Sequence, residues 1–333
     1  MAFNPRRFWR SKAFKSVIRL ILVLWAVSAL SFALVAASPI DPVRAYVGEV
    51  GEANLNPEMM AKFRAYFGTD VPPLKRYANW LSGAVRGDLG QSLVFRQPVM
   101  EVVGDRFMNS LALMLAAWAL SGIIAFGLGL LAGIFRESAW DKAIRTYSLV
   151  LASAPTFWLA LIALMIFAVK LKWLPIGLSA PIGKSAADVT ILDNIRHLVL
   201  PALTLSVTSI AAITLHTREK VVDVMEEDFI LYARSRGESL PGIVKKHALR
   251  NVALPAITLQ FASFSEIFGG SVLVEQVFSY PGLGQAAVLA GMRGDSPLLL
   301  GIAVISAFLV FAGNFIANIL YGLIDPKIRR GEG

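Results

Sequence analysis

The sequence predicts an all-α integral membrane protein with six transmembrane helices. Of its 333 residues, 56% are hydrophobic and 17% are charged, and the mean hydropathy is +0.62, which is too apolar for an ordinary soluble domain. A helix needs roughly 20 apolar residues to cross a bilayer. Five runs of suitable length lack Asp, Glu, Lys and Arg: 20–37, 107–135, 146–169, 197–217 and 296–324. A sixth run, 251–274, contains one charge, Glu266.

The cations are spread unevenly over the segments between these runs. The net charge is +9, and 19 of the 32 Lys and Arg residues fall in the segments 1–19, 136–145, 218–250 and 325–333. The tail before the first run has six cations and no acid. By the positive-inside rule, both terminal tails and the 218–250 loop are expected in the cytoplasm. The basic excess therefore indicates topology and argues against nucleic-acid binding.

The first run is expected to be an anchor helix rather than a cleaved signal peptide, because its 18 residues exceed a usual signal h-region. The loop at 38–106 then faces outward, with eight basic and eight acidic residues. A helix is expected from Asn56-Pro57 to Phe67-Gly68, and a second from Tyr77 to Val85. The remaining five spans form a core over 107–324. The chain has no cysteine, which excludes disulfides and Cys-based metal sites.

Glycines and prolines within the runs indicate how the helices pack. Gly129 and Gly133 form a GxxxG pattern that lets two helices approach closely in lipid. Pro155 lies inside the third run and is expected to kink it or free a carbonyl. Pro201 and Pro255 lie near the start of their runs, where proline is tolerated.

The charged loop at 218–250 is expected to fold as a helix, a sharp turn and a second helix. Asp228–Arg236 contains no breaker, and Gly237 can end that helix with a positive φ. Ser239 suits an N-cap and Pro241 the following first turn. Composition alone favours a solvated loop that contains some interfacial helix.

Motifs in register along nearly the whole chain resemble the permease subunits of binding-protein-dependent ABC importers, in the branch for dipeptides, oligopeptides and nickel. The most specific is Tyr232-Ala233-Arg234-x-x-Gly237, followed by His-Ala-Leu-Arg-Asn at 247–251 and Leu254-Pro255. Further matching segments are 41–42, 68–70, 86–92, 153–158, 173–175, 197–201, 275–284 and 325–326. Two departures are the proline at 241 and the lack of a glycine before Asp41-Pro42.

The resemblance implies the type I ABC importer permease fold in the cytoplasmic (inner) membrane, with a cytoplasmic coupling helix that docks on an ATPase. Matching positions make Tyr232, Ala233, Arg234 and Gly237 the expected contacts, while His247 and Asn251 support the return helix. The chain lacks GxxxxGK[ST], so no cofactor is expected on it and ATP–Mg is expected on the partners. The implied partners are two cytoplasmic ATPase subunits, a second permease, different or identical, and an extracytoplasmic solute-binding protein.

Five residues are candidates for the substrate pathway or a gate. Glu266, the one acid inside a predicted span, either meets a cationic part of the substrate or serves as a structural or water-facing group; relatives do not typically show an acid there. Residues 275–284 are expected just outside the fifth span, near the outer gate of related permeases. The candidates in that segment are Glu275, Pro281, Gly282 and Gly284. The three histidines are scattered, so no metal site is expected.

The expected function is therefore a transport subunit, not an enzyme. A secondary transporter or channel that works without ATPases is the alternative, but it would need ion-coupling groups in several spans. A membrane-embedded enzyme would need clustered His, Asp or Glu at one depth. The transported substrate stays open among peptides, nickel or metal chelates, opines and modified oligosaccharides.

Overall fold

The computed structural model describes residues 5–39, 41–48, 51, 55–67, 70–185 and 187–324. Within these residues the chain is helical, with one isolated bridge between Gln91 and Pro98. It divides into two compact units: Met1–Met108 with Gly282–Phe311, and Asn109–Pro281 with Ala312–Gly333. The predicted helix end at Gly68 and the 325–333 tail, including Asp325-Pro326, lie outside the described residues.

The first unit combines the long N-terminal helix with short helices. Its helices are α1 (Pro5–Ala36), α2 (Pro42–Val47), α4 (Pro57–Phe67), α5 (Pro73–Val85), α14 (Leu283–Arg293) and the first parts of α6 (Val99–Ile134) and α15 (Ser296–Ile324). The two helices predicted in the 38–106 loop correspond to α4 and α5. The Asn56 side chain accepts a hydrogen bond from the Met59 N–H at 2.7 Å. Helix α5 begins at Pro73, before the expected Tyr77, because proline suits a first turn.

A buried carboxylate fastens the turn before α6 to the start of α15 in this unit. Asp295 has no exposed surface. Its carboxylate accepts hydrogen bonds from the Ser92 hydroxyl at 2.6 Å and the Val94 N–H at 2.9 Å. It also caps α15 by accepting the Leu298 N–H at 3.1 Å. These hydrogen bonds compensate the buried charge of Asp295 and hold the turn before α6 against the start of α15.

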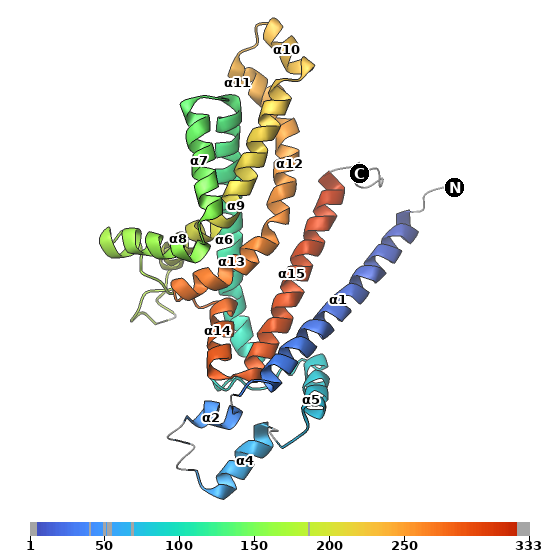
Figure 1. The fold of residues 1–333 in the computed structure, drawn as a ribbon, viewed down its shortest axis with the longest axis vertical. Helices are drawn as coiled ribbons and strands as arrows, with labels where there is room; N and C mark the ends of the chain where they lie inside the picture. Colours follow the sequence, from blue (N-terminus) through green and yellow to red (C-terminus); the bar gives the residue numbers. More distant parts are fainter. Residues whose placement is uncertain are drawn as a thin grey trace. The chain divides into compact units, whose positions relative to one another are not determined.

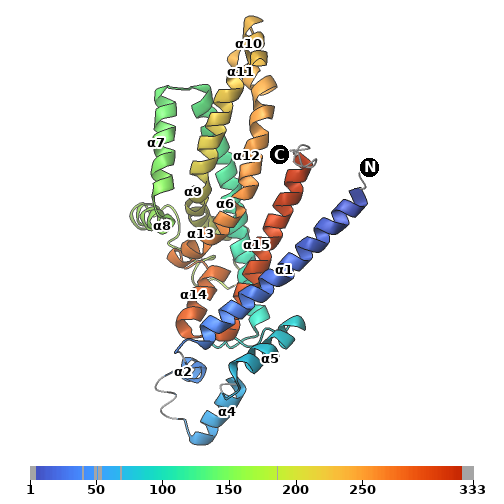
Figure 2. The ribbon, with the colours of Figure 1, turned by 45° about the vertical axis from the view of Figure 1, so that its right-hand side comes forward.

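The second unit is built around α9, which lies against α7, α8, α12 and α13 (Figure 1). The elements that follow α6 in this unit are α7 (Ala139–Ser153), α8 (Thr156–Ala163), η1 (Leu164–Lys170), α9 (Ile191–Met225), α10 (Asp228–Ser235), α11 (Leu240–Ile243), η2 (Val244–Ala248), α12 (Leu249–Ala262) and α13 (Phe264–Val277). The short helices α10 and α11 lie at the end of the α9–α12 pair that is remote from α8 and α13 (Figure 2).

The described helices include four long enough to cross a membrane, and six spans result if each of two bent pairs crosses once. The predicted kink at Pro155 is a full break, because α7 and the α8–η1 helix meet at 109°. Ala154, directly before the proline, is extended at φ −90° and ψ 132°, as sterics before proline require. The second bend, 47°, lies between α12 and α13 at Ser263.

The expectation that Pro201 and Pro255 lie near helix starts was wrong, since both lie inside helices, α9 and α12. Helix α9 begins at Ile191 because Thr190 and Asp193 form a reciprocal capping box, with bonds of 3.2 and 3.0 Å. The charged residues of that first turn lie outside the apolar run from which the start was inferred.

The GxxxG pattern of α6 permits the close helix approach that the sequence predicts, and the partner helix is α9. A Cβ atom on Gly129 would lie 2.6 Å from the Thr217 Cβ, and one on Gly133 would overlap Val221. Both distances are shorter than side chains tolerate, so only glycine permits this approach. The crossing lies next to Arg218 of α9, whose carbonyl would be 2.9 Å from the added atom on Gly133.

Candidate functional site

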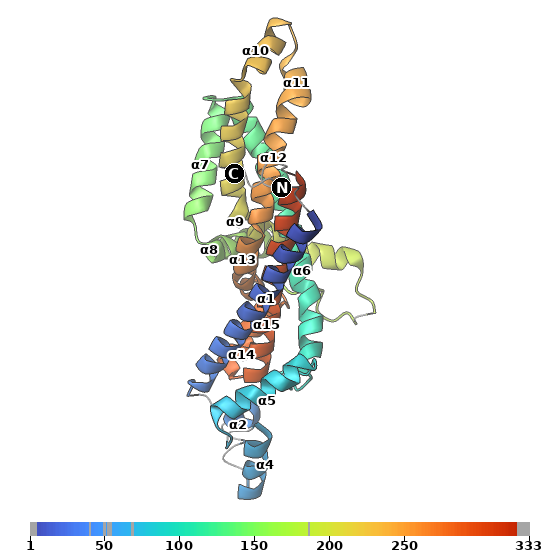
Figure 3. The same ribbon diagram turned by 90° about the vertical axis from the view of Figure 1, so that its right-hand side faces the viewer.

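The segment from Glu226 to Asn251, here called the elbow, folds as the sequence predicts. Helix α10 ends in a Schellman motif, in which the Gly237 N–H bonds the Arg234 carbonyl at 2.9 Å and the Glu238 N–H bonds the Ala233 carbonyl at 3.2 Å. Gly237 has φ 77°, which glycine adopts without strain. Ser239 takes the N-cap position of α11, although its side chain makes no capping bond. The return arm continues through η2 into α12 (Figure 3).

A hydrophobic cluster packs the elbow against the adjoining ends of α6, α9 and α12. Ile230 of α10 and Val252 of α12 have no exposed surface. The other buried members are Val221, Val224, Met225, Ala233, Ile243 and Ala248, with Phe126, Leu130 and Ile134 of α6 packed against them. Fully burying an aliphatic side chain contributes roughly 1.5–3 kcal/mol. The elbow is therefore a packed element rather than a solvated loop.

The opposite face of α10 presents aromatic and charged groups to the surroundings. Tyr232 is 64% exposed and Phe229 is 41% exposed. Arg234 and Gly237 are also exposed. Ala233 differs from the expectation, because it is only 2% exposed and packs in the cluster beneath the helix. Its small side chain thus lets α10 lie close to its base rather than contact a partner.

The two arms of the elbow are joined by polar contacts around Glu238. Its carboxylate lies 3.3 Å from His247 Nε2 and 3.7 Å from Lys246 Nζ. The Asn251 amide donates a hydrogen bond to the His247 carbonyl at 3.0 Å. The structure thus places His247 and Asn251 in the return arm, where the sequence predicts them.

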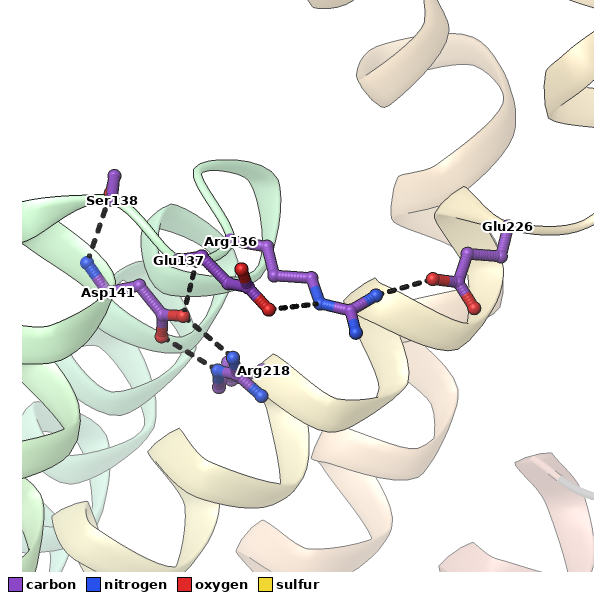
Figure 4. Close-up of polar contacts among 6 residues, drawn as sticks. All are labelled: Arg136, Glu137, Ser138, Asp141, Arg218 and Glu226. Carbon is purple, nitrogen blue, oxygen red and sulfur yellow. Dashed lines mark hydrogen bonds and ion pairs between the residues drawn. The ribbon is translucent and has the colours of Figure 1, made fainter.

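Sequence reasoning missed a buried ion pair at the base of the elbow (Figure 4). Arg218 of α9 donates two hydrogen bonds to the Asp141 carboxylate of α7, both 2.7 Å long. Asp141 has no exposed surface and also accepts the Glu137 N–H at 2.9 Å. Nearby, Arg136 pairs with Glu226, the C-cap of α9. The only signals in the sequence were a charge at the edge of one apolar run, Arg218, and a charge in the short segment between two others, Asp141, and spacing does not reveal which charges pair.

At the other end of this unit, Glu275 is not outside the fifth span as predicted. It lies in α13 with no exposed surface, and its carboxylate accepts the Ser110 hydroxyl at 2.6 Å. Helix α13 extends further because this partner satisfies the acid inside the protein. Burial, with a smaller contribution from Glu275, raises the pKa of Tyr280 to about 12. Pro281 follows, and its carbonyl accepts the Asn109 amide at 3.0 Å.

Asn109 and Tyr280 also line a cavity of about 580 Å³ at the start of α9. Its other lining residues are Ala112, Ser179, Ala180, Lys184, Val189, Ile191, Asn194, Ile195 and Leu198. The wall is part polar and part apolar, and several amide and hydroxyl groups face one space. A solute with both characters suits such a wall.

The remaining pathway candidates are not brought to this cavity. Gly282 and Gly284 belong to the other unit, as the N-cap and second residue of α14. Glu266 is nine residues before Glu275 on α13, hence on the opposite helix face. It is exposed, and no side chain in the described part of the chain pairs with it.

A second missed group is Gln260, a buried amide in α12. Its Nε2 donates to the Trp118 carbonyl and the Ser121 hydroxyl, while the Trp118 indole donates to the Gln260 carbonyl at 2.8 Å. These bonds join α6 to α12 just before the bend at Ser263. Elsewhere in the described residues, no group of three or more His, Asp or Glu is placed to hold a metal ion.

Comparisons with known proteins agree on one family. Residues 125–330 match the family "Binding-protein-dependent transport system inner membrane component", and residues 11–114 match its N-terminal companion, "Binding-prot-dependent transport system membrane comp, N-term". The oligopeptide transport system permease protein AppB of Bacillus subtilis is 35% identical over 309 residues, covering 92% of this chain and 96% of AppB. The di/tripeptide transport system permease protein DppB of Pseudomonas aeruginosa is 34% identical over 325 residues, covering 93% and 96%.

The fold is also that of a chain in a solved ABC transporter. A chain of the MetNI methionine ABC transporter in an inward facing conformation superimposes with a TM-score of 0.54 at 15% identity, covering 68% of this chain and 97% of that one. The predicted fold class is thus confirmed, and the relatives are permeases rather than enzymes. The chain belongs to the family of binding-protein-dependent transport system inner membrane components, the permease subunits of ABC importers.

Proposed function

We propose that this chain is the permease subunit of an ATP-driven importer for peptides, forming half of the translocation pathway. The observation that carries the proposal is the elbow, which exposes Tyr232 and Arg234 on a rigidly packed base. A rigid element that joins two spans transmits a partner's movement to the bundle as a rigid-body displacement. The peptide class is supported by two relatives, AppB and DppB, which are permease proteins of oligopeptide and di/tripeptide transport systems.

The energy source in this proposal is a pair of separate ATPase subunits that bind ATP–Mg. The chain has no GxxxxGK[ST] sequence. Tyr232 and Phe229 supply the aromatic contact area that interfaces favour, and Arg234 adds a planar cation. Gly237 shapes the turn beside them. His247 and Asn251 stabilise the return arm, which transmits the movement of the ATPase to α12.

The same proposal places both terminal tails and the elbow on the cytoplasmic side of the inner membrane. This orientation is supported by the concentration of 19 of 32 cations in the alternate segments that include the elbow. A second permease subunit of the same family, encoded separately, completes the pathway, and an extracytoplasmic binding protein delivers the solute. Association with an identical copy is the alternative that stoichiometry distinguishes.

Within the pathway, we assign the outer gate to the segment from Glu275 to Gly284. Glu275, Tyr280 and Pro281 are held by α6 through Ser110 and Asn109, beside the 580 Å³ cavity. Gly282 and Gly284 follow in the sequence, as the N-cap and second residue of α14. Glu266 is exposed on the face of α13 opposite Glu275, and we propose that its carboxylate meets a cationic part of the substrate there. A Glu266→Gln variant with normal uptake would remove this last assignment.

The test is to purify the affinity-tagged chain from its native membranes and identify the proteins that co-elute. We expect an ATPase with a P-loop and a second permease. The complex in liposomes should take up labelled trialanine only with ATP inside and binding protein outside. Isolation without an ATPase, together with uptake by the chain alone, would instead show a secondary transporter. Ligand screening of the binding protein separates peptides from nickel chelates and opines.

A further inference from the structure

We propose that Asp141 and Arg218 are a positioning pair for coupling: their buried contact fixes α7 to the base of the elbow, so that both move together. The proposal rests on the proposed function, since coupling has meaning only for an ATP-driven permease. It concerns residues outside the surface that contacts the ATPase. The pair acts through α9, at whose end the elbow begins.

The geometry of the pair is that of a specific, directional contact. Arg218 presents Nε and Nη2 to the two Asp141 oxygens at 2.7 Å each, the fork arrangement that lysine cannot reproduce. The Asp141 side chain is 1% exposed and the Arg218 side chain 15% exposed. Salt therefore screens this pair far less than a surface pair.

The turn that supplies Asp141 is itself rigid. Ser138 caps α7 by accepting the Asp141 N–H at 3.2 Å, and Asp141 accepts the Glu137 N–H in return. Glu137 has φ 63°, an unfavourable conformation for a residue other than glycine. Such a conformation persists only where surrounding contacts determine it. The carboxylate thus closes the turn between α6 and α7 and binds α9 at the same time.

Two ion pairs contact α9, one within the helix and one at its C-cap, where the elbow begins. The buried pair lies at Arg218, and the exposed pair of Arg136 with Glu226 lies two helical turns later. The glycine crossing of α6 lies beside Arg218, and α6 also packs into the cluster beneath α10. These contacts therefore link helices α6, α7 and α9 into one packed block, and the elbow extends from the end of α9.

The two ion pairs differ in burial, which gives a matched comparison. Arg136 and Glu226 are 48% and 68% exposed, so their contact contributes little. Losing one partner of the buried pair leaves the other charge without compensation and disfavours the native arrangement strongly. Asp141→Asn removes one charge of the buried pair, and Arg218→Lys keeps the charge but loses the two-bond fork. Both are therefore expected to loosen the block, whereas Glu226→Gln is not.

The first measurement uses the distance between α7 and α10. The natural chain has no cysteine, so Thr146→Cys and Ser235→Cys carry spin labels at unique, exposed positions. In nanodiscs, double electron–electron resonance should give a narrow distribution of the distance between the two spin labels for the otherwise unaltered chain and for Glu226→Gln. Asp141→Asn should broaden it. An unchanged distribution in a folded Asp141→Asn protein would overturn the proposal.

The second measurement is labelled trialanine taken up per ATP hydrolysed by the complex in liposomes. Asp141→Asn and Arg218→Lys should still bind the ATPase and hydrolyse ATP, while the ratio falls at least about tenfold. Exchanging the charges, Asp141→Arg with Arg218→Asp, should restore part of it. If hydrolysis and uptake fall together, or the ratio stays unchanged, the pair does not position the elbow. If the unaltered complex neither contains an ATPase nor transports trialanine, the proposed function fails, and the distance measurement still tests the pair.

Discussion

Replacing Gly237 with alanine is expected to loosen the elbow without changing its surface. Gly237 has φ 77° at the end of α10, and a Cβ atom there would meet nothing within 4 Å. The cost is therefore conformational rather than steric. Holding an L-residue in this left-handed region costs about 1–2 kcal/mol. Gly237→Asn is the matched control, because asparagine visits the same region routinely.

The expected magnitude follows from the opening equilibrium of the elbow. A loss of about 1–2 kcal/mol raises the open population roughly 5- to 30-fold. Cleavage of a transiently open segment follows that population when closing is fast. Trypsin should therefore cut at Arg234 and Arg236 faster by this factor in Gly237→Ala, and much less so in Gly237→Asn.

Cleavage at Lys184 serves as an internal reference for the trypsin assay. Lys184 is exposed at the opposite end of the same unit, so the rate of cleavage there should be equal in all three proteins. Equal rates at Arg234 in the wild type and Gly237→Ala would refute the left-handed turn. Equal acceleration by alanine and asparagine would show that the side chain, not the backbone conformation, matters.

Three further predictions concern packing, a buried carboxylate and a buried phenol. Gly133→Ala should destabilise by about 1–3 kcal/mol through overlap with Val221, whereas Gly127→Ala, with open space around it, should be neutral in thermal denaturation. Asp295→Asn should lower the free energy of unfolding by about 1.5–3 kcal/mol, while Asp88→Asn, at an exposed position, should not. An Asp295→Asn protein as stable as the wild type would contradict the conclusion that Asp295 holds the turn before α6. The folded-state pKa of Tyr280 lies above its ordinary 10.0, so its contribution is complete below pH 10 and is lost as pH rises to about 12. Tyr280→Phe should remove this decline, of about 3 kcal/mol at most, from the pH dependence of unfolding; identical profiles would contradict it.

The elbow was predictable because its shape depends on local signals. Gly237 and Pro241 lie within five residues, and whatever surrounds them Gly237 permits a positive φ while Pro241 fixes its own φ. Ala233 shows the limit of that reasoning, since a motif gives the position of a residue but not the direction of its side chain. The motif placed it among the contacts, and the packing of α10 buried it.

The contacts that the sequence did not reveal are long-range. Asp141 and Arg218 are 77 positions apart. Arg218 directly follows an apolar run and Asp141 lies within the charged segment 136–145, so in the sequence both resemble ordinary charges at a membrane surface. Glu275 was interpreted as lying beyond the helix end because an acid is costly in a span. The partner that stabilises it, Ser110, lies on α6, and only the packing of α6 against α13 brings the two together. Pro155 predicts a kink, but the angle of that kink depends on how α8 packs in the folded protein.

The most direct test of the coupling surface is photo-cross-linking from Tyr232 in native membranes. With a benzoylphenylalanine in place of Tyr232, whose side chain is 64% exposed, illumination should yield an adduct with a P-loop ATPase, and the same probe at Lys184 should not. An adduct of Tyr232 with extracytoplasmic proteins, or its labelling by an impermeant reagent from outside the cell, would contradict the assignment of the elbow as the coupling site.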